Sequence, residues 1–231
     1  MKINEFFQEG RFINLDSRPD RRALIEEEIN SVGLKDFFVR FSACLPNLDN
    51  VTDGTAKGYR MHGACGRSHR TIVEDAKNRN LKNIIIMEDD AVFYNSGLKP
   101  AIEIIEGALD ELNKIPDWDL FFLGGIIIDE ELNPLIGNHL LRVEKCLTTH
   151  AWAINSRCYD HVLRYQPDID SPIDGCLGNH TGLNKYLAYP LACLQRPHHL
   201  SDCDLTGDGE RRKTGGTEPW LTNYSRPFKK Q

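Results

Sequence analysis

Short apolar runs alternate along this chain with segments whose apolar residues recur at helical spacing. The runs expected to form strands lie at 12–15, 37–41, 84–87, 119–123, 148–154 and 186–194. Helices are expected between them, near 19–32, 63–80, 98–115, 156–165 and 175–182. Strands that alternate with helices predict an α/β domain with a mostly parallel central sheet flanked by helices. Residues 46–58 are expected to form a loop and 126–147 a hairpin or an insertion, while Pro190 indicates that the last strand is an edge strand or is interrupted.

The most informative stretch is residues 84–93, in which a continuous apolar run is typical of a strand buried on both faces. Glu88, Asp89 and Asp90 follow it directly, and the chain then turns apolar again. Burial and mutual repulsion would raise the pKa values of these carboxyls, and a hard divalent cation would relieve both effects. An extended backbone would orient Glu88 and Asp90 to one side and Asp89 to the other. The alternative is a solvated turn with Asp90 as a helix cap, and these residues alone do not decide.

Composition narrows the class of protein. With 231 residues the chain is long enough for one large domain or two small ones. The net charge of −6 provides no global basic field and disfavours a nucleic-acid partner, except as an acceptor held by a local basic patch. No apolar run approaches the ~20 residues of a membrane span, and the N-terminus lacks the apolar core of a signal peptide.

Cysteine usage points to a compartment rather than to a site. The seven cysteines are scattered, and no Cys-x-x-Cys occurs. This pattern disfavours structural zinc and a disulfide framework. It predicts a reducing, cytoplasmic setting in which several cysteines are small core residues.

Two further patterns concern single elements. Arg18 and Arg21 lie at the start of a predicted helix capped by Asp16 or Ser17, where the helix dipole favours negative charge. They fit that position if an anion binds there, although pairing with neighbouring aspartates at the surface is the simpler explanation for either one. His69 lies on the inward stripe of the next helix, where a histidine is expected to be a core residue with its hydrogen bonds satisfied.

Several fragments occur in an order that one protein family shares. Residues 12–21 read Phe-Ile-Asn-Leu-Asp-Ser-Arg-Pro-Asp-Arg, and residues 63–69 resemble a Gly-Cys-x-x-Ser-His segment. Residues 84–93 match a Leu-Ile-Leu-Glu-Asp-Asp strand, and fragments at 119–124, 150–154, 172–174 and 189–197 follow in order. Over roughly residues 10–203 the chain thus resembles glycosyltransferase family 25, which includes bacterial lipopolysaccharide glycosyltransferases and the collagen galactosyltransferases.

The resemblance implies a GT-A-type, Rossmann-like α/β domain over residues 1–203. It also implies a nucleotide-sugar donor, usually a UDP-sugar, a divalent cation (Mn²⁺ or Mg²⁺), and inverting transfer to a hydroxyl acceptor such as a saccharide. The residues expected to bind the donor are Asn14, Asp16, Arg18, Arg21, Ser42, Ser68, Glu88 and Asp89. The expected metal ligands are Asp90, Glu88, His198 and His199. Among the three acids, Asp90 is the favoured ligand, Glu88 is expected to touch the nucleotide, and Asp89 to be structural.

Asp174, which matches the family's Pro-Val-Asp position, is expected to be the general base or an acceptor-binding residue, with a helix N-cap as the alternative. Gly175 follows it where the family often has an aromatic residue, so the acceptor stays open between a saccharide, a modified nucleic-acid base and a protein hydroxyl. A nucleotidyltransferase or phosphoesterase, and a non-catalytic nucleotide-sugar-binding protein, are the other interpretations. The tail 204–231 is expected to be a mobile segment or a lid. Trp152 is expected to pack in the core rather than to stack on a sugar.

Overall fold

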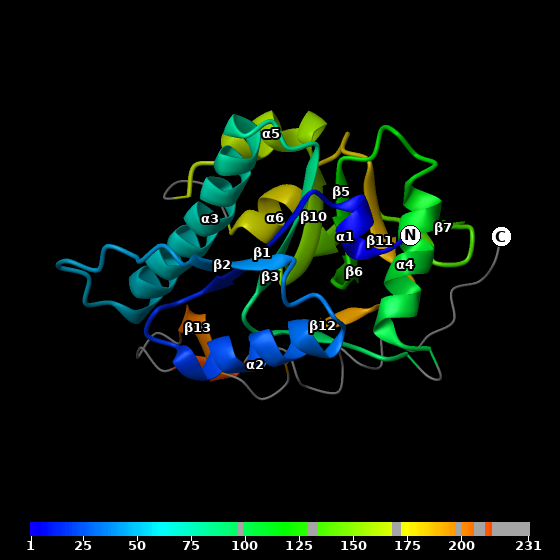
Figure 1. The fold of residues 1–231 in the computed structure, drawn as a ribbon. Helices are drawn as coiled ribbons and strands as arrows, with labels where there is room; N and C mark the ends of the chain where they lie inside the picture. The colour runs from blue at the N-terminus through cyan, green and yellow to red at the C-terminus, as the bar shows by residue number, and fades with distance from the viewer. Residues whose placement is uncertain (97–98, 129–133, 168–171, 197–199, 206–210, 214–231) are drawn as a thin grey trace.

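The computed structural model describes residues 1–96, 99–128, 134–167, 172–196, 200–205 and 211–213, and its centre is an eight-stranded sheet in the order β2-β1-β3-β10-β5-β11-β8-β7 (Figure 1). These strands are β1 (Glu9–Asn14), β2 (Phe38–Ser42), β3 (Asn83–Glu88), β5 (Leu120–Phe122), β7 (Leu135–Ile136), β8 (Leu140–Arg142), β10 (Ala151–Asn155) and β11 (Lys185–Ala188). Within this described sheet only β10 and β8 run against the other strands. The predicted α/β class with a mostly parallel central sheet is therefore confirmed.

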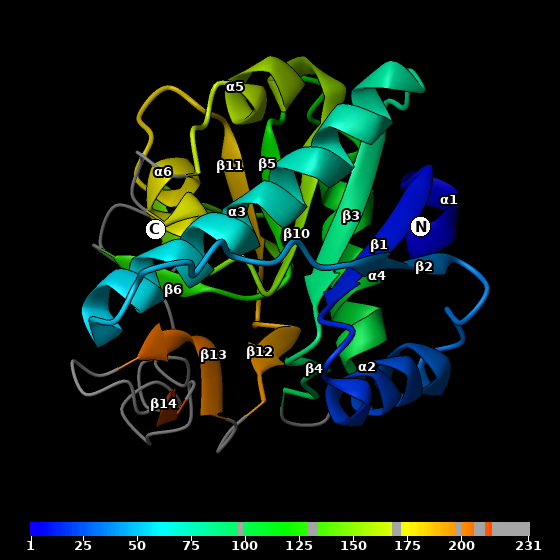
Figure 2. The same cartoon turned by 90° about the vertical axis from the view of Figure 1, so that its left-hand side faces the viewer.

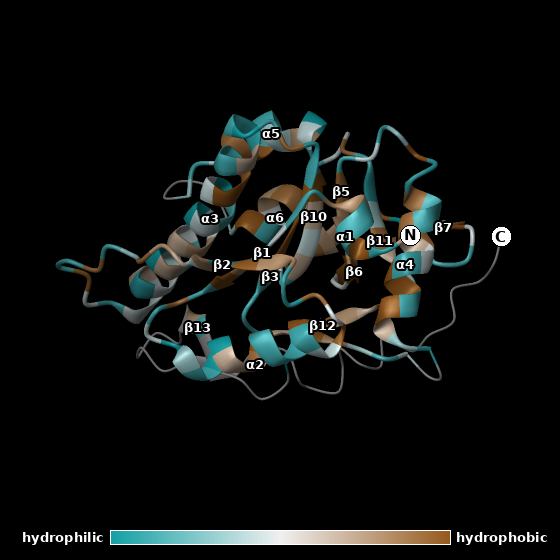
Figure 3. Ribbon diagram, viewed as in Figure 1, coloured by the Kyte–Doolittle hydropathy of each residue, from teal (hydrophilic) through white to brown (hydrophobic). Residues whose placement is uncertain are grey.

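Helices cover both faces of the sheet (Figures 1 and 2). They are α1 (Ile3–Phe6), α2 (Pro19–Ser31), α3 (Gly54–Asn78), α4 (Ala101–Leu112), the short 3₁₀ helix η2 (Ser156–Cys158), α5 (Tyr159–Leu163) and α6 (Ile173–Gly178). One apolar core joins α1, α2 and α4 to the sheet, and a second joins α3, α5 and α6 to its other face. Hydrophobic residues accordingly predominate on the central strands and on the helix sides that face them (Figure 3).

Among the described residues, three strand pairs lie outside the main sheet. They are β4 (Ala91–Phe93) with β12 (Cys193–Gln195), β6 (Ile126–Ile128) with β9 (Lys145–Leu147), and β13 (Leu200–Leu205) with β14 (Arg211–Lys213). All three are antiparallel. The pairing of β6 with β9 agrees with the hairpin expected within 126–147, and β4 with β12 frames the end of β3.

Helix α3 begins at Gly54, so the expectation of a loop over 46–58 is wrong for its last residues. The Asp53 carboxylate accepts a hydrogen bond from the backbone N–H of Ala56 at 2.8 Å and caps the helix. Helix α3 also packs against β13, as Figure 2 shows. This packing outweighs the low helix propensity of the glycines in its first half, which hid the helix from the sequence.

Helix α2 starts at Pro19 as predicted, but neither Asp16 nor Ser17 caps it. The N-cap is Arg18, whose side chain makes no capping hydrogen bond. The Asp16 carboxylate accepts a hydrogen bond from Arg40 instead of capping the helix. The last predicted strand is interrupted, as Pro190 indicated: β11 ends at Ala188 and β12 begins only at Cys193. It is not an edge strand, since β11 lies between β5 and β8.

The Gly124–Gly125 pair explains how β12 reaches the end of the sheet. A Cβ on Gly124 would lie 1.7 Å from the Cys193 carbonyl oxygen, and a Cβ on Gly125 would lie 2.4 Å from Cys146 Sγ. Only glycine permits this close approach of two backbone segments. Because β12 is held there, Gln195 and Arg196 lie beside the acids that follow β3.

Candidate active site

The acidic turn, defined as Glu88, Asp89 and Asp90, begins at the carboxyl end of β3, and its side chains inherit the alternation of that strand. Ile84 and Ile86 pack in the core beneath α3, whereas Ile85 and Met87 pack in the core beneath α2 and α4. Continuing this alternation places Glu88 toward α3 and Asp89 toward α2. Their hydrogen-bond partners, His69 on α3 and Arg21 on α2, agree with this placement.

Glu88 is anchored through one oxygen. Its Oε1 accepts a hydrogen bond from the Thr149 hydroxyl at 2.8 Å and lies 3.1 Å from His69 Nε2. Burial alone would raise the pKa of this carboxyl, but the hydrogen bonds from His69 and Thr149 outweigh burial and lower it. The side chain retains 22% of its exposure, so part of the carboxylate is open to solvent.

His69 is fully buried, and its ring is oriented from both ends. The Trp152 indole N–H donates to His69 Nδ1 at 3.2 Å. An indole nitrogen only donates, so Nδ1 accepts and the ring hydrogen lies on Nε2, which then donates to Glu88. The prediction of His69 as a core residue with satisfied hydrogen bonds is confirmed, and the bond to Glu88 makes it part of the site as well.

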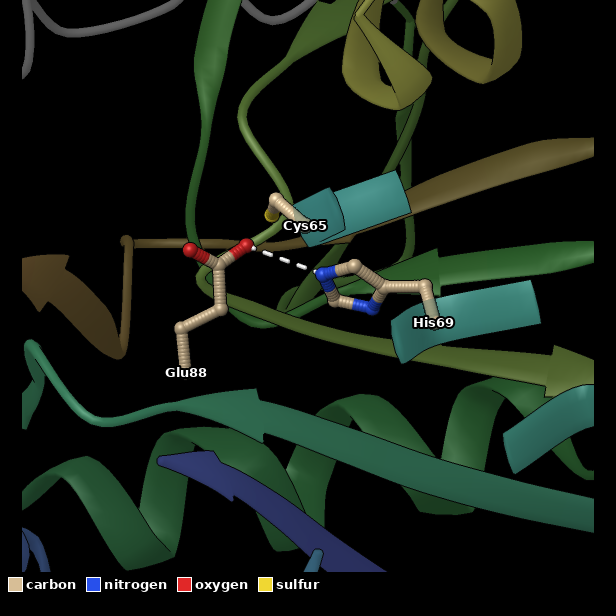
Figure 4. A group of neighbouring side chains, drawn as sticks. All are labelled: Cys65, His69 and Glu88. Carbon is tan, nitrogen blue, oxygen red and sulfur yellow. Dashed lines mark hydrogen bonds and ion pairs between the residues drawn. The ribbon is translucent and has the colours of Figure 1, made fainter. Parts of the chain in front are cut away.

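Cys65, His69 and Glu88 form a cluster whose ligand atoms lie within 4.8 Å of one another (Figure 4). Two features oppose a metal at this cluster. A metal on His69 Nε2 would leave a hydrogen on Nδ1, pointing at the Trp152 N–H. The hydrogen bond to Cys203, burial and the Glu88 charge together raise the pKa of the Cys65 thiol well above its usual range, which disfavours a thiolate ligand.

Asp89 accepts hydrogen bonds from two side chains of the protein. Its Oδ2 accepts from Asn14 Nδ2 at 2.7 Å, and its Oδ1 accepts from Arg21 Nη1 at 3.1 Å. Burial raises the pKa of this carboxyl although Asn14 and Arg21 act in the other direction. Asn14 also donates to the Arg18 carbonyl and accepts from Arg40, so its amide is fully engaged within the protein.

Asp90 differs from both neighbours. It is only 5% exposed, and among the described residues its Oδ1 has no hydrogen-bond partner. Its Oδ2 receives one long bond, 3.4 Å, from Gln195 Nε2, while its backbone carbonyl accepts from Arg196 N at 2.6 Å. Burial and the charges of Glu88 and Asp89 raise the pKa of Asp90 to about 7. A buried carboxylate oxygen without a donor fits a hard divalent cation, which takes oxygen ligands.

The start of α2 does receive an anion, but from the protein itself. Arg18 Nη1 donates to the Asp202 carboxylate of β13 at 2.6 Å, and Arg21 Nη1 lies 3.4 Å from the same oxygen. Arg18 also pairs with Asp20 at 2.8 Å, as the simpler explanation of these arginines required. The carboxylate of Asp202 thus occupies the position beside Arg18 and Arg21 where the sequence suggested that an anionic ligand binds.

The remaining predicted donor residues fall into two groups. Asp16 lies at the surface beyond β1, and the hydrogen bonds of Arg40 and Ser42 lower its pKa. Ser68, in contrast, is fully buried. Its hydroxyl accepts from the Cys44 backbone N–H at 2.9 Å and donates to the Ala64 carbonyl at 3.0 Å. Ser68 therefore anchors the segment after β2 to α3, with both interactions made inside the protein.

Asp174, the second residue of α6, binds backbone on two sides. Its Oδ1 accepts from Gly175 N at 2.8 Å and its Oδ2 from Thr148 N at 3.2 Å. Thr148 has a φ of +75°, a left-handed conformation that is strained for a β-branched residue. Asp174 therefore holds the strained turn that delivers Thr149 to Glu88. His198 and His199 lie outside the described residues, as does most of the tail.

Sequence reasoning missed Trp152, Thr149, Asp202 and Gln195 as parts of the site. Thr149, Asp202 and Gln195 reach the acidic turn or α2, and Trp152 reaches His69 on α3, each from more than 60 positions away in the chain. The fragment 189–197 was a signal for Gln195, because it matched the family pattern. In the part of the chain that the structure describes, no helix combines the length and apolarity needed to cross a bilayer.

One protein-family model matches part of the chain. Residues 8–115 match the sequence model of "Glycosyltransferase family 25 (LPS biosynthesis protein)". No curated protein matches the chain. The matched segment contains both ends of the His69–Glu88 pair, all of the acidic turn and the start of α2, whereas Asp174 and β12 lie beyond it.

Solved structures resemble the chain only distantly. One is mannose-1-phosphate geranyltransferase from Thermus thermophilus, with 10% identity and a TM-score of 0.41 over 78% of this chain and 72% of that one. Another is apo UDP-glucose pyrophosphorylase, with 6% identity and a TM-score of 0.40 over the same shares. Likenesses at this level carry no argument about function. The match over residues 8–115 confirms that the motifs at 12–21, 63–69 and 84–93 resemble those of glycosyltransferase family 25.

Proposed function

We propose that this protein is a GT-A-type glycosyltransferase that moves a sugar from a nucleotide-sugar donor, a UDP-sugar in the first instance, to a hydroxyl acceptor such as a saccharide. Transfer occurs with inversion and with a divalent cation, Mn²⁺ or Mg²⁺. The family match over residues 8–115 supports the reaction class. The observation that carries the proposal is the buried carboxyl of Asp90, which follows a central strand. Among the described residues, its Oδ1 accepts no hydrogen bond.

Asp90 is the proposed cation ligand, with His198 and His199, two and three residues after Arg196 in the sequence, as proposed companions. When bound, the cation neutralises the negative charge that develops on the departing diphosphate. Arg18 and Arg21 supply further positive charge at the start of α2. Asp202 forms ion pairs with both arginines, so a diphosphate that binds to Arg18 and Arg21 competes with the Asp202 carboxylate.

Glu88 and Asp174 have different proposed roles. Glu88 accepts, through Oε2, a hydrogen bond from a hydroxyl group of the nucleotide sugar, and it is not needed as a cation ligand. Asp174 removes the proton of the acceptor hydroxyl, on the face opposite the leaving group, as an inverting transfer requires. Both of its oxygens already accept backbone N–H bonds, which hold the carboxylate in a fixed orientation at the start of α6.

A donor-hydrolysis assay tests the proposal. The protein is incubated with a panel of nucleotide sugars, with Mn²⁺ and with a chelator, and free nucleoside diphosphate is measured. We expect cation-dependent release from one donor, which Asp90→Ala abolishes. The matched control is Asp20→Ala, because Asp20 is an exposed carboxylate near the same face that pairs with Arg18. Failure of every nucleotide sugar to bind at millimolar concentration would refute the proposal.

The role of Asp174 needs its own assay, since the residue also holds Thr148. Asp174→Asn keeps one acceptor oxygen and removes the base, so it should eliminate transfer while donor binding survives. Full transfer activity in this variant would exclude Asp174 as the base. An acceptor panel that includes oligosaccharides, a hydroxylated peptide and a nucleic acid with a hydroxymethylated base then decides the acceptor class.

A further inference from the structure

A chain of hydrogen bonds runs from the core to the site and ends on one oxygen of Glu88. Trp152 Nε1 donates to His69 Nδ1 at 3.2 Å, and His69 Nε2 lies 3.1 Å from Glu88 Oε1. Thr149 Oγ1 donates to the same oxygen at 2.8 Å. Trp152 and His69 are both 0% exposed, so neither touches a ligand directly in this conformation.

The hydrogen bonds on both sides of His69 determine which ring nitrogen carries the hydrogen. The Trp152 nitrogen can only donate, which makes Nδ1 of His69 an acceptor and leaves the ring hydrogen on Nε2. A doubly protonated ring, or one with its hydrogen on Nδ1, would set two N–H groups against each other. Trp152 and the Glu88 carboxylate therefore require the same tautomer of His69, the one that donates to Glu88.

The second oxygen of Glu88 is left for a ligand. Oε1 accepts from two donors, whereas among the described residues no donor contacts Oε2. Figure 4 shows this oxygen turned away from His69. A carboxylate that is fixed through one oxygen and open at the other accepts a hydrogen bond from a hydroxyl group, and its fixed orientation lowers the entropy lost on binding.

We propose that Trp152 and His69 are positioning residues, which fix the rotamer of Glu88 so that Oε2 receives a hydroxyl of the nucleotide-sugar donor. This inference rests on the proposed function. The hydroxyl belongs either to the ribose or to the transferred sugar. Neither positioning residue takes part in the chemical step, so their loss weakens binding of ground state and transition state alike, which raises KM and leaves kcat close to its original value.

Nuclear magnetic resonance tests the tautomer without any ligand. The ¹⁵N resonances of the His69 ring distinguish a protonated from an unprotonated nitrogen, and we expect the hydrogen on Nε2 in the unmodified protein. Trp152→Phe keeps the aromatic packing but removes the indole donor, so the ¹⁵N resonance of Nδ1 should shift with the loss of its hydrogen bond, while the hydrogen stays on Nε2 beside the Glu88 carboxylate. A hydrogen on Nδ1 in the unmodified protein, or an unchanged spectrum in Trp152→Phe, overturns the inference.

Calorimetric titration with UDP and with the UDP-sugar, both in Mn²⁺, tests the consequence. We expect His69→Leu to weaken binding by about 10- to 100-fold, the effect of one lost hydrogen bond to a charged group. His69→Gln supplies a donor and an acceptor with similar spacing and should restore most of the affinity, and Trp152→Phe should show a smaller loss. If UDP and the UDP-sugar weaken equally, the hydroxyl is on the ribose; if only the UDP-sugar weakens, it is on the sugar.

The two levels of the proposal fail differently. If the unmodified protein binds no nucleotide sugar, the proposed function is wrong, whereas the tautomer measurement still stands. If it binds a donor with the same affinity and KM as a folded His69→Leu variant, the function survives and the positioning role is refuted. A loss of kcat alone in Trp152→Phe would also refute it, since positioning for donor binding acts on KM.

Discussion

Glu88 and Asp90 are two carboxyls separated by one residue, and the protein treats them in opposite ways. Glu88 accepts two short hydrogen bonds, which lower its pKa, and keeps part of its surface open. Asp90 is more deeply buried, has an oxygen without a donor among the described residues, and has a pKa raised to about 7. The environment of each carboxyl therefore depends on where strand β3 ends. Glu88 still belongs to β3, whereas Asp90 lies in the turn beyond it.

The largest expected effect concerns cation binding. Asp90→Asn should weaken Mn²⁺ binding by at least about 100-fold, because it removes a direct ligand, and outer-shell changes alone cost about 10–100-fold. Glu88→Gln should change it by less than about tenfold. Electron paramagnetic resonance of free Mn²⁺ measures both. Equal losses in the two variants would break the comparison and make Glu88 a ligand too.

The second effect is on stability and depends on pH. Asp90 holds its proton more tightly in the folded protein, with a pKa of about 7, than in the unfolded chain, where the ordinary value is 3.8. Between these values the folded state binds more protons, so this group's contribution makes the protein less stable as the pH rises. In chelator at pH 8, Asp90→Asn should therefore be more stable than the unmodified protein by about 4 kcal/mol.

The same denaturation series at pH 4 provides the control, since Asp90 is then largely protonated in the folded state and the advantage of the asparagine should disappear. Glu88→Gln should behave in the opposite sense at neutral pH. Its carboxylate has a lowered pKa, which stabilises the fold above the ordinary value of 4.5 and is lost as the pH falls through the folded pKa. A pH-independent gain in Asp90→Asn would contradict the assignment.

A smaller effect is expected when Glu88 loses the hydrogen bond from Thr149. Thr149→Val keeps the shape of the side chain but removes one of the two donors to Glu88 Oε1. We expect a loss of about 1 kcal/mol in the free energy of unfolding and a donor affinity about fivefold weaker. Chemical denaturation and calorimetric titration measure the two quantities. An unchanged donor affinity would mean that His69 alone fixes the carboxylate.

The smallest functional effect is expected at Ser68. Ser68→Ala leaves the Cys44 N–H without its partner and should cost about 1–2 kcal/mol of stability. Donor affinity should not change, because the hydroxyl lies wholly inside the protein. Ser42→Ala, at the end of β2 beside Asp16, is the matched comparison. A donor affinity that falls in Ser68→Ala but not in Ser42→Ala would return Ser68 to the binding site.

The sequence predicted six of the eight strands described in the main sheet and the central place of the acidic turn, because a buried apolar run followed by acids is visible in a single segment. The division of labour within the turn was visible only in part. The alternation argument placed Glu88 and Asp89 on opposite sides, as found, but assumed an extended chain through Asp90, where β3 has already ended. The contacts that set each carboxyl apart come from Thr149, from His69, which Trp152 orients, and from Gln195. They depend on the packing of distant segments and leave no local pattern.

The position of β10 has a consequence for the order of events during synthesis. Strand β10 lies between β3 and β5 and pairs with β3 through five residues, although it follows β3 by more than 60 positions. A nascent chain that has reached residue 115 therefore presents β3, with its run of isoleucines, as an unprotected edge. The segment that carries the family match is thus not expected to fold alone. The two carboxyls acquire their separate characters late, Glu88 when Thr149 arrives and Asp90 only after Gln195 has left the ribosome.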